Sequence, residues 1–385
     1  MQTDKIRILF LIPDFRRGGA ERYLTDFCNE LIKNNDIEFQ IGVLFDLNQF
    51  NEETSRFNIT YIPYKTFRLF KQNSNFHFQS LLKSFKPHII HTHLYLAEFL
   101  SAYYSDPSIS YVCHCHDNME QFKNFSFFDL FSKKRIYELY EKHFLISRKY
   151  KKTNTFFIAN SRHTLQYFKQ ALPSFLENNT KLIYYGFHFN KFKQISPRTI
   201  SNSRPIKIIN VGSFQAKKNQ ILLLEIAKKL SFLNISFEMN LIGDGELLGF
   251  IKSKIKTYKL EDKVFCHGIR NDVEQWYKNS DIYIHPAYYE PFGLVFLEAM
   301  ASRLPIISLN GKGNADLIQE GKNGYLIQEQ KPELFIEKIK LLIDNPDIYS
   351  IISNNGYVFS KDFDMSNHLE NILGFYKEII SRKRI

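Results

Sequence analysis

Cysteine and tryptophan are scarce in this 385-residue sequence, which has four Cys and one Trp. The cysteines fit neither a disulfide framework nor the paired C-x-x-C spacing of a zinc site, which indicates a reducing compartment. No stretch reaches the ~18 apolar residues that span a bilayer. The opening Ile6–Ile12 run is short, contains Arg7 and precedes Pro13 rather than a cleavage site. We therefore expect a cytoplasmic protein, at most peripheral at the inner face of the cell membrane.

Aromatic and basic residues are abundant instead. The chain has 37 Phe and 22 Tyr, and its net charge is +11. Residues 121–152 contain nine basic and three acidic side chains, interleaved with Phe and Leu. That mixture suits an anionic surface such as a bilayer or a pyrophosphate-linked lipid. A solvated helix with its aromatic side in the core explains it equally. Membrane contact through 121–152 is therefore one of two readings, and we expect no nucleic-acid partner.

Strand-like apolar runs alternate with helix-length segments, and the pattern restarts after residue 185. The length also favours two domains. We expect residues 1–185 and 205–363 to form two α/β domains joined by a polar linker, 186–204. Residues 364–385 are expected to be a helix that crosses back to the first domain. Such alternation predicts parallel sheets, which bind ligands at the carboxyl ends of their strands. We expect the two sheets to face each other across a cleft.

The strongest motif is residues 281–301, DIYIHPAYYEPFGLVFLEAMA. A strand leads into a turn that carries Glu290, and a helix follows that carries Glu298. Two carboxylates so placed can address one ligand at different depths. The helix start near Gly293 offers free N–H groups and a positive dipole end, which suit a diphosphate.

This segment resembles the retaining glycosyltransferases of GT-B fold, family 4, in which both glutamates occur with F-G between them. The resemblance implies two Rossmann-like domains and places Glu290 on the hydroxyls of a donor hexose. It places Glu298 on the ribose hydroxyls of the nucleotide. It also implies that the intervening backbone lies along sugar and phosphate, at Phe292, Gly293 and Leu294.

Two glycine-containing loops extend the resemblance. Residues 17–22 (RGGAER) resemble a loop in which Gly19 brings the backbone close to the donor phosphates. Residues 210–219 (NVGSFQAKKN) resemble a second-domain phosphate loop with Gly212. There Lys218 would neutralise the leaving diphosphate, with Lys217 as the neighbour that could take its place.

One departure from the family pattern is Ser213, which stands where the family usually has Arg. Either phosphate stabilisation is weaker in this chain or another cation substitutes, the candidates being Lys217, Arg16, Arg17 and Arg270. By the same resemblance, Gly243 would lie in a structural turn with an indirect donor contact, and Arg270 would end a segment that holds the nucleotide base through backbone groups. Residues 311–316 correspond to a loop that supplies N–H groups to phosphate or sugar.

A histidine-rich region lies in the first half, around His91, His93, His114 and His116. By resemblance, His116 would touch the donor sugar. Residues 114 and 116 share one face of a strand and residues 113 and 115 the other, so four metal ligands cannot converge from this strand alone. We expect no metal site and no cofactor, since Lys and helix dipoles stabilise the diphosphate in GT-B enzymes.

The resemblance predicts a retaining glycosyltransferase that uses a nucleotide sugar, with a UDP-hexose or UDP-N-acetylhexosamine favoured. The predicted acceptor is a glycan or a lipid-linked glycan of the cell envelope. Glu290, Lys218 and His116 are the predicted catalytic residues. The alternatives are a nucleotide-sugar epimerase or a phosphorylase of the same fold, and a catalytically dead carbohydrate-binding scaffold.

Overall fold

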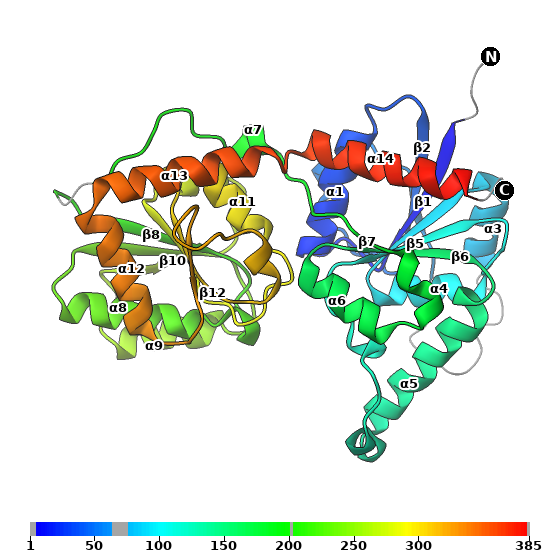
Figure 1. Ribbon diagram of the computed structural model, residues 1–385, viewed down its shortest axis with the longest axis horizontal. Coiled ribbons are helices and arrows are strands. Elements are labelled where there is room, and N and C mark those ends of the chain that lie inside the picture. Colours follow the sequence, from blue (N-terminus) through cyan, green and yellow to red (C-terminus); the bar gives the residue numbers. More distant parts are fainter. Residues whose placement is uncertain (1–4, 64–75, 201–202, 383–385) are drawn as a thin grey trace. The chain divides into compact units, whose positions relative to one another are not determined.

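The computed structural model describes residues 5–63, 76–200 and 203–382, and the chain divides into two compact units. Unit 1 comprises Met1–Gly186 and Met365–Ile385, and unit 2 comprises Phe187–Asp364. Each unit has one parallel sheet with helices on both faces (Figure 1).

Unit 1 contains a seven-stranded parallel sheet with the order β3-β2-β1-β4-β5-β6-β7. Its strands are β1 (Ile6–Ile12), β2 (Ile37–Val43), β3 (Ile59–Tyr61), β4 (Ile89–His93), β5 (Ser110–Cys115), β6 (Asn154–Ala159) and β7 (Thr180–Leu182). Its α-helices are α1 (Gly19–Leu31), α2 (Asn51–Thr54), α3 (Phe76–Phe85), α4 (Tyr95–Tyr103), α5 (Lys133–Leu145), α6 (Arg162–Ala171) and α14 (Met365–Ser381).

Strand β1 shows why this sequence forms a buried sheet. It pairs with β2 on one side and β4 on the other, and its residues from Ile8 onward are fully buried. A parallel strand covered on both faces needs apolar side chains on each face, which explains the unbroken IRILFLI run.

The C-terminal helix α14 packs against α1 in unit 1 (Figure 1). Two hydrogen bonds fix it there: Tyr23 Oη lies 2.7 Å from His368 Nε2, and His91 Nδ1 lies 2.5 Å from Tyr376 Oη. Residues at the two ends of the chain therefore share one core.

Unit 2 contains a six-stranded parallel sheet with the order β10-β9-β8-β11-β12-β13. Its strands are β8 (Ile206–Val211), β9 (Phe237–Ile242), β10 (Val264–Cys266), β11 (Ile282–His285), β12 (Ile306–Leu309) and β13 (Tyr325–Ile327). Its α-helices are α7 (Phe189–Phe192), α8 (Gln220–Phe232), α9 (Leu248–Thr257), α10 (Val273–Lys278), α11 (Leu294–Ala301), α12 (Pro332–Asp344) and α13 (Pro346–Lys361).

Strand order reverses once in each sheet, between β1 and β4 and between β8 and β11. In open α/β sheets, ligands bind beyond the carboxyl ends of the strands at this point. The loops after β8 and β11 therefore mark the place in unit 2 to examine for a site.

The stretch 186–204, expected to be a polar linker, packs largely on unit 2; residues 201–202 lie outside the described residues. Phe192 and Ile200 are buried, and Arg198 donates to the carbonyl oxygen of Tyr277 at 3.2 Å. Apolar residues scattered among polar ones attach this segment without giving it a helical period. In the part of the chain that the structure describes, no helix combines the length and apolar character that a membrane crossing requires.

Candidate active site

Glu290 lies in the turn between β11 and α11, beyond the carboxyl end of β11, and its side chain is buried. Its Oε2 atom lies 2.5 Å from Lys218 Nζ and 3.1 Å from His285 Nε2. Lys218 comes from the loop after β8, the neighbouring strand. The strand-order reversal therefore brings together two residues that are 72 positions apart.

The charge of this pair follows from its surroundings. Burial acts to raise the pKa of Glu290, but the Lys218 ammonium and the adjacent His285 outweigh it and hold the pKa well below the usual range. Burial lowers the pKa of His285, which favours the neutral imidazole. Unit 2 thus holds an ionised carboxylate against an ammonium at neutral pH.

The loop at residues 310–313 fixes the backbone of Glu290. Its N–H donates to the carbonyl oxygen of Gly311 at 2.7 Å, and its carbonyl accepts from the N–H of Gly313 at 3.0 Å. A Cβ on Gly313 would lie 1.8 Å from the carbonyl oxygen of Pro291, so only glycine fits there. We expected this loop to donate its N–H groups to a ligand. One of them, the N–H of Gly313, instead donates to Glu290.

Helix α11 begins four residues after Glu290, at Leu294, with Phe292 buried ahead of it. Gly293 has φ +94°, and a Cβ there would lie 2.4 Å from the Phe296 ring. No side chain caps this helix end. The N–H of Phe296 donates to the carbonyl oxygen of Gly293 at 3.0 Å, which leaves the N–H groups of Leu294 and Val295 for an anion. Glu298, one turn along, is half-buried and accepts from Tyr277 Oη at 3.1 Å.

The loop after β8 packs tightly on the loop after β9. A Cβ on Gly243 would lie 2.1 Å from the carbonyl oxygen of Gly212, whereas a Cβ on Gly212 would meet nothing within 4 Å. Gly243 therefore allows the two loops to approach closely, and Gly212 has open space beside it. Ser213 is half-exposed next to Gly212.

Two cations of unit 2 were candidates to replace the Arg that is absent at position 213. Lys217 Nζ lies over the Tyr289 ring, 5.9 Å from its centroid. Arg270 pairs with Asp272 at 2.9 Å and lies 5.5 Å over the Trp276 ring. Of the two, Lys217 lies nearer to Glu290, because it contacts Tyr289, the residue before Glu290, and precedes Lys218, which pairs with Glu290. Lys217 is therefore the better candidate for the missing cation.

Gly19 is the first residue of α1 in unit 1; it is exposed, and a Cβ there would meet nothing within 4 Å. Glu21, in the first turn of the same helix, is buried. Burial raises the pKa of Glu21 to about 7, with Asp14 adding to the effect and Arg16 opposing it. Arg16 itself is held by Asp14, with Nη2 and Oδ2 2.6 Å apart.

His116 is part of a buried network. Its Nε2 lies 2.8 Å from His93 Nδ1, and its Nδ1 contacts Tyr185 Oη. Burial lowers the pKa of His116 to about 3, so the ring is neutral. Both ring nitrogens are engaged, and one contact would have to break before His116 touched a sugar, so that role stays a prediction.

Three further histidines converge on the same face of the sheet. Strand pairing places His93 beside His114, and one ring nitrogen each of His91, His93 and His114 lies within 4.8 Å of the others. Histidines of two neighbouring strands, β4 and β5, therefore converge, which alternation along β5 alone does not reveal. Burial, with neighbouring imidazoles adding to it, holds the pKa of all three well below the usual range. Neutral imidazole is the form that binds a metal ion, so the absence of a metal here stays a prediction.

Family comparisons cover both units. Residues 17–189 match Glycosyltransferase Family 4, and residues 191–359 match Glycosyl transferases group 1. The chain belongs to the group 1 glycosyltransferases.

Individual relatives match a smaller part of this family member. It is 30% identical, over 43% of its length, to an uncharacterized glycosyltransferase of Haemophilus influenzae, of which the match covers 48%. It is 27% identical, over 45% of its length, to the UDP-Gal:alpha-D-GlcNAc-diphosphoundecaprenol alpha-1,3-galactosyltransferase of Escherichia coli, of which the match covers 46%. The chain thus spans about half the length of these curated relatives.

Solved structures match across both units. The crystal structure of Anabaena HepE in complex with UDP and glucose has a TM-score of 0.78 to this chain at 22% identity. The match covers 97% of this chain and 100% of that one. The fold is therefore that of the GT-B glycosyltransferases.

Several residues that contact the site of this group 1 glycosyltransferase are not evident from its sequence. Trp276 stacks under Arg270, and Tyr277 hydrogen-bonds Glu298; both come from α10. The only signal was that the single Trp of the chain lies six residues after Arg270. The burial of Glu21 had no signal in the sequence beyond its place in the GGAE motif.

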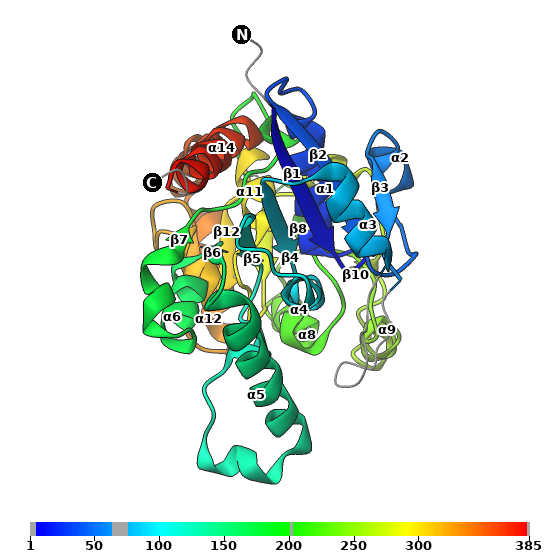
Figure 2. The same ribbon diagram turned by 90° about the vertical axis from the view of Figure 1, so that its right-hand side faces the viewer.

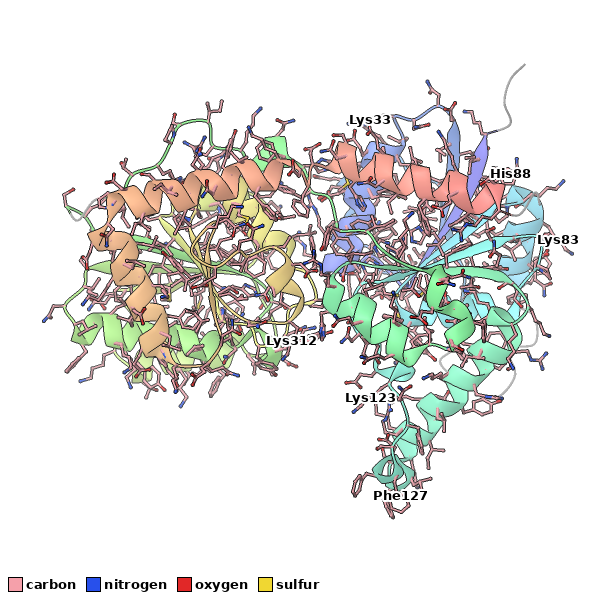
Figure 3. The ribbon with its side chains drawn as sticks, viewed as in Figure 1. Lys33, Lys83, His88, Lys123, Phe127 and Lys312 are labelled. Carbon is pink, nitrogen blue, oxygen red and sulfur yellow. The ribbon has the colours of Figure 1, made fainter. Side chains whose placement is uncertain are left out.

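A cavity of about 750 Å³ lies in unit 1, at the amino ends of β4 and β5. Lys83, Lys86 and His88 are among its lining residues (Figure 3 labels Lys83 and His88). None of the predicted site residues lines it. Because GT-B ligands bind at the carboxyl ends of strands, we do not assign this cavity to the donor.

Proposed function

We propose that this chain is a retaining glycosyltransferase that transfers a hexose or N-acetylhexosamine from a UDP-sugar to a glycan or lipid-linked glycan of the cell envelope. The observation that carries the proposal is the Lys218–Glu290 pair at the strand-order reversal of unit 2. A ligand that contacts both groups must carry an anion and hydroxyl donors side by side, as a sugar joined to a diphosphate does. The uridine base and the lipid-linked acceptor are supported by the Escherichia coli relative, a UDP-Gal:alpha-D-GlcNAc-diphosphoundecaprenol galactosyltransferase, and by the UDP in the HepE complex.

The proposed roles follow from charge. Glu290, ionised at neutral pH, accepts hydrogen bonds from sugar hydroxyls. Lys218 and the free N–H groups of α11 stabilise the leaving diphosphate. Glu298 accepts hydrogen bonds from the ribose hydroxyls. These groups supply positive charge where the leaving group develops negative charge, so we propose that no metal ion or cofactor takes part.

Retention is proposed to follow front-face transfer. The bond from the anomeric carbon to the diphosphate oxygen breaks, and the bond to the acceptor oxygen forms on the same face. The acceptor proton passes to the departing diphosphate. This route needs no enzyme nucleophile beneath the sugar, and Glu290 is committed to Lys218 rather than free to attack.

The test measures UDP release from UDP-hexoses and UDP-N-acetylhexosamines in the presence of EDTA, with lipid-linked envelope glycans as acceptors. We expect Glu290→Gln to lower kcat/KM by about a hundred-fold or more, since it removes a charge that acts on the reacting sugar. Glu261→Gln, which changes an exposed carboxyl of the same unit in the same way, is the control.

Other outcomes identify the rival functions. Release of free sugar without an acceptor would indicate an epimerase, and a requirement for inorganic phosphate would indicate a phosphorylase. UDP binding without turnover of any donor would indicate a dead scaffold. Turnover by Glu290→Gln at the wild-type rate would disprove the assignment of this site.

A further inference from the structure

A projection of unit 1 presents apolar side chains to solvent. It consists of the 3₁₀ helix η2 (Phe127–Phe131) and α5, and it extends away from the sheet of its own unit (Figures 1 and 2). Figure 3 places Phe127 at its outer end. Four side chains there, which we call the aromatic tip, are 72%, 81%, 52% and 82% exposed: Phe127, Phe128, Leu130 and Phe131.

The aromatic tip is held in place by polar contacts. The N–H of Ser126 donates to Asp129 Oδ2 at 2.7 Å, and Arg135 Nε donates to Asp129 Oδ1 at 3.2 Å. Arg135 Nη1 also donates to the carbonyl oxygen of Glu120 at 3.0 Å. The rings contact one another edge to face, with the Phe127 and Phe131 centroids 6.3 Å apart. Exposure of the tip is thus a property of the fold, not of a loose loop.

The apolar surface continues along α5. Ile136, Leu139 and Tyr140 are 47%, 40% and 52% exposed and have the i, i+3, i+4 spacing of one helix face. A large apolar patch facing water indicates an interaction site.

The charge around the tip is positive, although less so than the sequence count implies. Lys149 is fully buried with Glu98, and their Nζ and Oε1 atoms are 2.7 Å apart. Lys149 therefore adds no positive charge to the surface. Arg135 and Lys134 pair with Asp129, Glu138 and Glu120, so this cluster has one negative charge in excess. Lys123 and Lys133 remain exposed, at either end of the segment that carries η2.

We infer that the aromatic tip inserts into the surface of an anionic lipid bilayer, with Lys123 and Lys133 on the headgroups. Bulky rings enter the boundary between headgroups and acyl chains, and lysines beside them bind anionic lipids. A second copy of the chain is disfavoured, because a symmetric contact through the tip would set these lysines against themselves. The inference does not depend on which sugar or acceptor the enzyme uses.

The test is co-sedimentation of the full chain with vesicles of phosphatidylcholine and phosphatidylglycerol, and with phosphatidylcholine alone. We expect binding to the anionic vesicles. The triple variant Phe127→Ser, Phe128→Ser, Phe131→Ser should weaken binding to the anionic vesicles by about a hundred-fold, since it removes all three rings that would be buried in the bilayer. Lys123→Glu with Lys133→Glu should weaken it by about ten-fold or more. The control is Phe232→Ser, which removes an exposed ring from unit 2.

A second measurement keeps the test decisive if the triple variant aggregates. Phe128→Trp should show a blue-shifted emission with anionic vesicles that the wild type, whose only Trp is Trp276, does not show. Failure of the wild type to bind anionic vesicles, or equal binding by the tip variants, would overturn the inference. Self-association of the wild type that the triple variant abolishes, without vesicle binding, would assign the tip to a second copy. UDP binding by the same variants, measured in parallel, reports on the donor site separately.

Discussion

Single residues of unit 2 reveal function through charges that the fold does not need. A buried ion pair contributes little net stability, because desolvation of both ions offsets their attraction. Lys218 and Glu290 are nevertheless held together at the strand-order reversal, with His285 beside them. Two apolar residues of similar volume would pack as well or better. The pair therefore argues for chemistry at this position rather than for stability.

Glu21 gives a pH-dependent prediction. Its folded pKa of about 7 lies above the ordinary 4.5, so stability from this group is present below pH 4.5 and is lost as pH rises through 7. Glu21→Gln removes that loss and should raise the free energy of unfolding at pH 8 by on the order of 3 kcal/mol, but very little at pH 4. Urea denaturation at the two pH values measures this difference.

Glu38→Gln is the matched control for Glu21→Gln, because Glu38 is an exposed carboxyl of the same unit. It should shift the free energy of unfolding by the same small amount at both pH values. A Glu21→Gln variant equally stable relative to wild type at pH 4 and pH 8 would show that the buried carboxyl is not destabilising when ionised.

The sequence identified residues where type and spacing together had a chemical meaning. Glu290, Glu298 and Lys218 fell in motifs, and the structure places the first and third in contact. The sequence predicted only part of the histidine cluster. The alternation of side chains along β5 follows from the sequence, whereas the pairing of β4 with β5 does not. Burial of Glu21 depends on side chains that pack from elsewhere, which no local pattern records.

At the scale of elements, the loop after β12 is the most constrained part of the site. Gly313→Ala would place a Cβ 1.8 Å from the carbonyl oxygen of Pro291, so the loop or the Glu290 turn must move. We expect a loss of about 1–3 kcal/mol in the free energy of unfolding, as for other forced overpacking. Gly249→Ala, in helix α9 with open space around it, should be neutral or slightly stabilising. Urea unfolding midpoints compare the two, and equal midpoints would contradict the steric account.

Elements were predictable where their patterning was long or flanked by clear turns. β1, β5, β8 and β9 have the bounds that their apolar runs predict. The sequence pattern does not indicate β7 and β13, each of which has three residues at a sheet edge. Ser161, a residue type that favours helix starts, caps α6 by accepting from the N–H of Thr164 at 3.2 Å.

At the scale of the whole molecule, each sheet has the doubly wound order that alternating strands and helices imply. The sequence pattern predicted two α/β domains, and the family resemblance added their GT-B character. Neither the pattern nor the resemblance predicted the hydrogen bond between Tyr23 of α1 and His368 of α14, two residues that are 345 positions apart. Contacts of that span depend on the complete fold and not on any local segment.

The central claim is that unit 2 binds a nucleoside diphosphate sugar, and a thermal-shift comparison tests it most directly. UDP, GDP, ADP and their common sugars are added to the wild type, Glu298→Ala and the control Glu261→Ala. We predict that UDP and a UDP-sugar raise the Tm of the wild type and the control, and that Glu298→Ala weakens this binding about ten-fold or more. No shift of the wild type with any nucleotide, or an equal shift of Glu298→Ala, would contradict the account.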